Sequence, residues 1–185
     1  MNLHEKYLKY KSKYLKLKQQ MEKNILFGGE SNEDMINNVA SKLHEKWQIE
    51  FKANNPGITT RMKLSNGSNG EQIDILNTDY KDLPEFWQRE NKLAAIVAVE
   101  LFYEKLEPIL SNYKSLPENL NNELAFVRDH CASIIHDKWL ERNTWAKSDP
   151  NLSVEFNKLS ENEKNKDRVQ IDIVYALWKN QQEQK

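Results

Sequence analysis

Residues 134–168, IIHDKWLERNTWAKSDPNLSVEFNKLSENEKNKDR, contain the end of one predicted helix, a loop and the beginning of another helix. Apolar side chains recur at helical spacing from residue 120 to residue 139, which predicts a helix that continues to about Asn143. Ser160 followed by Glu163 has the pattern of a capping box, and the apolar positions of a last helix come after it. The stretch therefore predicts a helix–loop–helix unit.

An earlier part of the chain matches this stretch in two places. Leu43–Trp47 (LHEKW) pairs with Ile135–Trp139 (IHDKW) at an offset of 92 residues. Downstream, Asp82–Lys92 pairs with residues 158–168 at an offset of 76. The order of the two matches is preserved, and the difference between the offsets falls in the intervening loop, where insertions are tolerated. We interpret the chain as a duplicated helix–loop–helix unit.

The expected fold class is mainly α, with the duplicated units packed as one compact helical body, because neither copy can bury its apolar face alone. The expected boundaries are residues 1–30 for an N-terminal arm and linker, 31–112 for the first repeat and 113–185 for the second. Within the first loop, ITTRMKL and EQIDIL flank SNGSNG, and the Asn-Gly steps favour a small β-hairpin. Asp82 before Pro84 is expected to cap a third helix that runs to about Glu107.

The first 23 residues predict an extra amphipathic helix, with a stripe of Tyr7, Tyr10, Tyr14 and Leu17 flanked by seven lysines. One interpretation is that this stripe packs on the rest of the fold, or on a second copy as a short coiled coil. The other is a basic arm that docks on a partner. Gly28-Gly29 is expected to act as a flexible joint.

Composition excludes several classes of function. The 185 residues carry 27 Lys and Arg against 28 Asp and Glu, a net charge of -1, so no overall field attracts nucleic acid or acidic lipid. Cys131 is the single cysteine, which excludes an intrachain disulfide and a Cys-rich zinc site. No glycine-rich phosphate loop, secretory signal or membrane span is recognisable. We expect no catalytic residues, metal or cofactor, and an intracellular or particle-enclosed location.

In each copy a histidine and a tryptophan lie three residues apart and so share one helix face. His44, Trp47, His136 and Trp139 are expected to define the fold: the tryptophan packs under the loop and the histidine bonds a loop carbonyl. Leu83 and Leu159 complete this set.

The alternative is an aromatic groove that stacks on a ligand and meets an anion with basic side chains. Its candidates are Trp47, Trp139, Trp145, Arg61, Arg142, Lys164 and Arg168.

The second copy resembles the ryanodine-receptor repeat domain, through a His-acid-x-Trp helix, a Trp-bearing loop, a Pro-x-Leu element and Phe-x-x-Leu-Ser-x-x-Glu-Lys. Residues 41–100 resemble a divergent copy, with LHEKW and DYKDLPEFWQRENK, but their loop lacks the family's Gly-Trp and His-Pro elements. The resemblance implies an all-helical, noncatalytic module. The residues that match the family are His44, Trp47, Leu83, Pro84, His136, Trp139, Pro150, Leu152, Phe156, Leu159, Glu163 and Lys164. Separately, YLKYKSKYLKLK before Gly-Gly resembles a segment of giant DNA virus proteins, mimivirus-like ones in particular.

The expected function is therefore a binding module that recognises a protein or a small anionic ligand. The alternative is a nucleic-acid-associated or virion structural protein, in which lysines of the N-terminal arm contact phosphates and tyrosines stack on bases.

Overall fold

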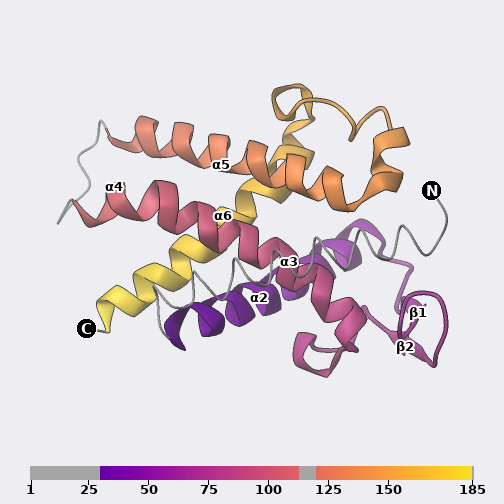
Figure 1. Ribbon diagram of the computed structural model, residues 1–185. Coiled ribbons are helices and arrows are strands. Elements are labelled where there is room, and N and C mark those ends of the chain that lie inside the picture. The colour runs from indigo at the N-terminus through magenta and orange to yellow at the C-terminus, as the bar shows by residue number, and fades with distance from the viewer. Residues whose placement is uncertain (1–29, 113–119, 185) are drawn as a thin grey trace, which may run out of the picture. The chain divides into compact units, whose positions relative to one another are not determined.

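The computed structural model describes residues 30–112 and 120–184. The predicted N-terminal helix with Tyr7, Tyr10, Tyr14 and Leu17 lies outside the described residues, so its docking role stays a prediction. By the density of their contacts, residues 1–35 and 36–185 form two separate units. The second unit holds nearly all of the described structure (Figure 1).

The described part of the chain is mainly helical, which confirms the predicted fold class. Its α-helices are α2 (Glu30–Asn54), α3 (Glu85–Leu101), α4 (Glu107–Ser111), α5 (Leu120–Arg142) and α6 (Glu161–Glu183). A π-helical turn, η2 (Phe102–Leu106), joins α3 to α4. Short 3-10 helices are η1 (Tyr80–Asp82), η3 (Thr144–Ser148) and η4 (Phe156–Lys158), and the strands are β1 (Met62–Leu64) and β2 (Gln72–Asp74).

Two helix ends differ from the prediction. The third helix does not begin at an Asp82 cap, because Asp82 lies in η1 and the residue before α3 is Pro84, with no side-chain cap. The helix also continues through η2 and then past Glu107 as α4, since Pro108 falls in the first turn of α4, where an amide hydrogen is dispensable. The cap of the last helix is confirmed: Ser160 Oγ accepts a hydrogen bond from the Glu163 amide at 3.3 Å.

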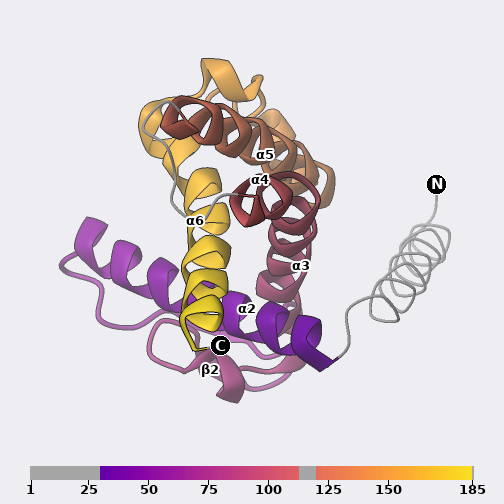
Figure 2. The same ribbon diagram turned by 90° about the vertical axis from the view of Figure 1, so that its left-hand side faces the viewer.

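The core lies where α3 and α5 run alongside each other and α6 crosses both (Figures 1 and 2). Val99 and Phe102 are buried here from the α3 segment, Ile135 from α5, and Ile171 and Val174 from α6. The ring of Phe102 packs against those of Tyr175 and Trp178, with centroids 6.4 and 5.7 Å apart. Burying an aliphatic or aromatic side chain of this size contributes about 1.5–3 kcal/mol.

The predicted hairpin is confirmed, and it is fastened to the start of α3. β1 and β2 pair antiparallel with Lys63 opposite Ile73. Gly67 has a φ of 82°, in the region that favours glycine, and a Cβ there would lie 2.2 Å from the ring of Phe86. The indole of Trp87 donates to the Leu64 carbonyl at 2.9 Å. The hairpin thus packs on the first turn of α3.

Candidate functional site in the two loops

The first loop, residues 55–84, is bonded to α2 through a buried histidine. His44 Nε2 lies 2.9 Å from the Thr78 carbonyl oxygen, and Gln48 donates to the same oxygen at 2.9 Å. The His44 ring stacks on Trp47, with centroids 5.5 Å apart and planes at 26°. Burial lowers the pKa of His44, while the bond to Thr78 and the charge of Asp79 raise it. The neutral imidazole therefore holds the loop on the helix.

The second loop, residues 143–160, makes the corresponding contact with α5. His136 Nε2 lies 3.2 Å from the Val154 carbonyl oxygen, and its ring stacks on Trp139 at 6.3 Å and 24°. The two histidines are 92 positions apart, whereas the two acceptors, Thr78 and Val154, are 76 apart. These are the offsets of the two sequence matches.

The segments after the two acceptors also correspond. η1 and η4 each span three residues, at an offset of 76, and each is followed by a buried leucine. Leu83 is 4% exposed and Leu159 is 5% exposed. A long helix then begins two residues after each leucine. Both loops thus end in the same way.

A buried carboxyl group distinguishes the second loop from the first. Asp167 on α6 is 8% exposed, and its Oδ2 lies 3.4 Å from His136 Nδ1. Burial raises the pKa of Asp167 to about 7, with Glu163 raising it further and Lys166 lowering it. At an offset of 76 the first copy has Asn91, which donates to the Trp87 carbonyl at 3.3 Å. Asp167 was not among the residues predicted from the sequence. The signal that could have found it is its alignment with Asn91, because an ionisable residue in one copy replaces a neutral one in the other.

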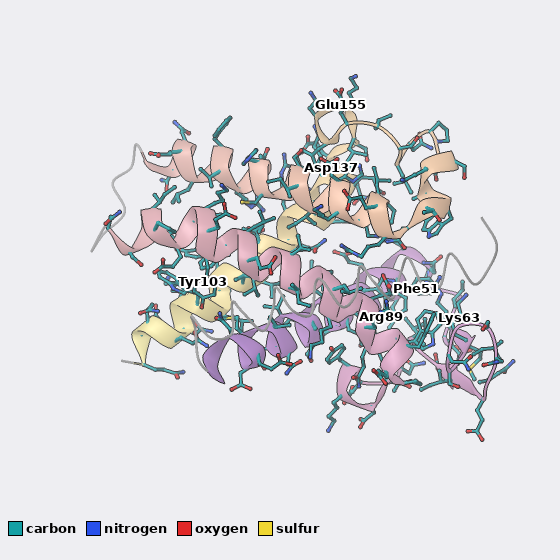
Figure 3. The ribbon with its side chains drawn as sticks, in the orientation of Figure 1. Phe51, Lys63, Arg89, Tyr103, Asp137 and Glu155 are labelled. Carbon is teal, nitrogen blue, oxygen red and sulfur yellow. The ribbon has the colours of Figure 1, made fainter. Side chains whose placement is uncertain are left out.

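The two matched tryptophans carry different partners. Trp139 meets Trp145 edge to face, with centroids 5.8 Å apart and planes at 84°. Trp145 lies in η3 and is 63% exposed. Trp47 is covered from its loop by a cation instead. The Arg61 guanidinium lies over it, 5.4 Å from the ring centroid of Trp47 and 4.7 Å from that of Phe51. In Figure 3, the label Phe51 marks the region of Trp47 and Arg61, Lys63 marks the hairpin, and Glu155 marks the second loop.

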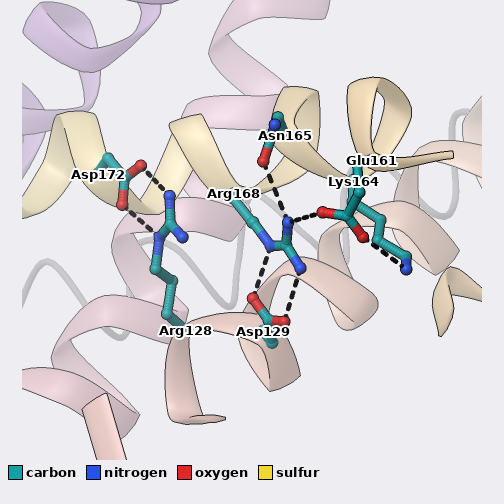
Figure 4. A network of polar contacts seen from close by, with 7 residues as sticks. All are labelled: Arg128, Asp129, Glu161, Lys164, Asn165, Arg168 and Asp172. Atoms are coloured by element: carbon teal, nitrogen blue, oxygen red, sulfur yellow. Dashed lines mark hydrogen bonds and ion pairs between the residues drawn. The ribbon is translucent and has the colours of Figure 1, made fainter. Parts of the chain in front are cut away.

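Two of the predicted anion-binding cations are already paired with carboxylates (Figure 4). Arg168 donates to both oxygens of Asp129 at 2.7 Å and to Glu161 at 2.7 Å, and these bonds raise its pKa. Lys164 contacts the other Glu161 oxygen at 2.9 Å. The same two cations lower the pKa of Glu161. Their charges hold α6 to α5 and stabilise the first turn of α6.

Arg142 is not part of these ion pairs. Among the described residues its Nε is buried without a hydrogen-bond partner. Burial lowers the pKa of its guanidinium, and the nearby charges of Glu90 and Glu141 raise it. The contacts within the described part of the chain therefore divide the seven predicted groove residues into separate groups. These contacts join Trp47 with Arg61, Trp139 with Trp145, and Lys164 with Arg168 through Glu161.

Other reactive features are weak in the described part of the chain. No group of three His, Cys, Asp or Glu side chains there is arranged to hold a metal ion. Cys131 is buried, and burial raises the pKa of its thiol to about 11, so the thiolate needed for nucleophilic attack is scarce at neutral pH. A shallow pocket of about 390 Å³ opens between the hairpin turn and the first turn of α3; it is lined by Ser65, Asn66, Pro84, Glu85, Phe86 and Arg89.

Within residues 30–112 and 120–184, every helix is too short or too polar to pass through a lipid bilayer. A comparison of the chain with protein-family models, curated proteins and solved structures found no match.

Proposed function

We propose that this chain is a noncatalytic binding module, built from two ryanodine-receptor-like repeats, which recognises a protein partner through its second loop. The duplication is supported by the two histidine–carbonyl contacts, whose donors and acceptors are separated by the offsets of the sequence matches. A duplicated scaffold keeps its packing residues in both copies, whereas a partner needs only one binding loop. The loops are accordingly where the copies differ.

The exposed ring of Trp145 is the observation that carries this proposal. It is 63% exposed and rests edge-on against Trp139, which in turn stacks on His136. A large aromatic side chain held in place by neighbouring rings loses little conformational freedom on binding, and tryptophan is enriched at the centres of protein interfaces. Trp145 therefore fits the role of an anchor in a pocket of the partner.

A protein partner is favoured over a small anion because two of the four basic side chains of the predicted groove are paired with carboxylates, while a third, Arg61, lies over the rings of Trp47 and Phe51. Arg168 and Lys164 are bound to carboxylates. Arg142 is buried within the influence of Glu90 and Glu141. An anion that binds Arg168 or Lys164 would have to displace these carboxylates, whereas an apolar pocket could take up Trp145 without breaking an ion pair.

The test uses photo-crosslinking from position 145, with position 126 as a matched control. Phe126 is also an exposed aromatic residue, 76% exposed, but it lies on α5 outside the loop. We expect a discrete adduct from a photoreactive residue at 145 and none from 126, and Trp145→Ala to weaken binding of the captured protein by at least about tenfold. Equal adducts from both positions, or equal binding of Trp145→Ala and Phe126→Ala, would contradict the proposal.

The seven lysines within residues 1–29 favour the second candidate, a nucleic-acid-associated or virion structural protein of a giant virus. Lysine–phosphate contacts release counterions, so such binding should weaken steeply with salt and vanish on deletion of residues 1–23. Recognition through Trp145 should survive that deletion. The two functions therefore separate in a single set of binding measurements, and light scattering on the same deletion reports self-association through the arm.

A further inference from the structure

Both ring nitrogens of His136 face oxygen atoms. Nε2 lies 3.2 Å from the Val154 carbonyl oxygen, and Nδ1 lies 3.4 Å from Oδ2 of Asp167. A carbonyl oxygen and an ionised carboxylate oxygen can only accept hydrogen bonds, and a neutral imidazole has one N–H. Both contacts can therefore be hydrogen bonds only when the pair holds one extra proton, either on the imidazole or on the Asp167 carboxyl group.

We propose that the His136–Asp167 pair is a proton-dependent switch that holds the second loop on α5 when the extra proton is bound and releases it when that proton is lost. Release of the proton to solvent leaves a single N–H for two acceptors. A hydrogen bond to an ionised carboxylate is stronger than one to a neutral carbonyl, so the one remaining N–H then lies on Nδ1. The bond that is lost is the one from Nε2 to Val154.

Burial of Asp167, together with the charges around it, places this transition near neutral pH. The charged groups that act on the Asp167 carboxyl are Glu163 and Lys166, both from α6 itself, while the His136 ring faces it from α5 at 3.4 Å. Because burial and Glu163 raise the pKa of the carboxyl group to about 7, it keeps its proton well above the pH at which an exposed aspartate ionises. Raising the pH through about 7 removes the proton and, with it, the contact to Val154.

The first loop is a built-in control. His44 makes the same kind of bond to the Thr78 carbonyl, which Gln48 supports with a second donor. The position that corresponds to Asp167 is Asn91, whose side chain does not ionise. The contact between His44 and Thr78 needs only one N–H, so loss of a proton at alkaline pH does not weaken it.

Amide hydrogen exchange at about pH 6 and about pH 8.5 tests the switch, with rates corrected for the intrinsic effect of pH. The informative amides are those bonded within the second loop, such as Ala146, Leu152 and Leu159. We expect their exchange to accelerate about tenfold at the higher pH, the factor for loss of one buried hydrogen bond. Amides of the first loop should not change, which is the reference within the same molecule.

Asp167→Asn should abolish the pH effect. The side-chain amide of asparagine donates to Nδ1 of His136, the Nε2–H keeps donating to the Val154 carbonyl, and the amide has no proton to lose. Glu163→Gln and Lys166→Gln leave the pair intact and should move the midpoint in opposite directions, to lower and higher pH respectively. The ¹⁵N chemical shifts of His136 should report a move of the N–H from Nε2 to Nδ1. Second-loop exchange that is the same at both pH values, or that changes equally in Asp167→Asn, would overturn the proposal.

Discussion

Gly67 illustrates a single residue whose identity is set by both backbone and neighbours. Its φ of 82° is costly for any residue with a Cβ, and the added atom would also meet the Phe86 ring at 2.2 Å. Gly57 lies in the same loop, but nothing lies within 4 Å of the position a Cβ would take. Two glycines of one loop thus have different physical roles.

Gly67→Ala should lower the free energy of unfolding by about 1–3 kcal/mol, because the left-handed backbone and the contact with Phe86 are both strained. Gly57→Ala should be neutral or slightly stabilising, since it only restricts the unfolded chain. Urea unfolding of both variants measures the difference. Equal effects at the two positions would show that the hairpin does not depend on its turn geometry.

At the scale of elements, α5 and α6 are held in register by two ion pairs of opposite polarity. Arg128 on α5 pairs with Asp172 on α6, whereas Asp129 on α5 pairs with Arg168 on α6 (Figure 4). Sliding one helix along the other would bring like charges together. The Arg168 side chain is 14% exposed, so its bonds are less weakened by solvent than those of a surface pair.

Arg168→Met should cost about 1–3 kcal/mol of stability, because it leaves Asp129 without its two charge-assisted bonds. The matched control is Lys42→Met, which breaks a pair with Glu45 in which both side chains are more than half exposed. That change should cost less than about 0.5 kcal/mol. Chemical unfolding at low and moderate salt compares them, and an Arg168→Met effect as small as the control would mean that the register rests on apolar packing alone.

The helical elements were largely predictable because their apolar periods are regular, whereas the π-helical turn was not. The buried residues Phe102, Leu106 and Leu110 recur every four positions, slightly more than the roughly 3.6 residues of an α-helical turn. The wider π turn takes up the excess and keeps all three on the buried face. From the sequence alone, this segment reads as a continuous apolar helix that should end before Pro108.

The part of the site that could not be predicted is which side chains from distant parts of the sequence bind each other. The histidine–loop contacts follow from the repeat, since helix spacing already places His and Trp on one face. The carboxylate that neutralises Arg168 comes from Asp129, 39 positions earlier, and which faces of α5 and α6 meet depends on packing of the whole unit. A free cation and a paired one look alike in sequence.

For the molecule as a whole, the buried His44 makes stability depend on pH. Its pKa is lowered in the folded state, so its contribution is present above the unfolded value of about 6.5 and is lost as the pH falls below it. His44→Gln should cost about 1–2 kcal/mol at about pH 7.5 and progressively less toward about pH 5, where the wild-type imidazole must be protonated. Urea unfolding at several pH values measures the difference in the free energy of unfolding between the wild type and His44→Gln. A difference that stays constant or widens in acid would contradict the prediction.

The buried position of Cys131 has a practical consequence for fluorescence experiments on this protein. Its thiol is 0% exposed and keeps its proton at neutral pH, so maleimide dyes should spare it in the folded chain. A new cysteine on the surface would then be the single site that reacts. Dye pairs or spin labels can be attached to the loops without removing the native thiol, and labelling of the unaltered protein under denaturing conditions becomes a direct readout of unfolding.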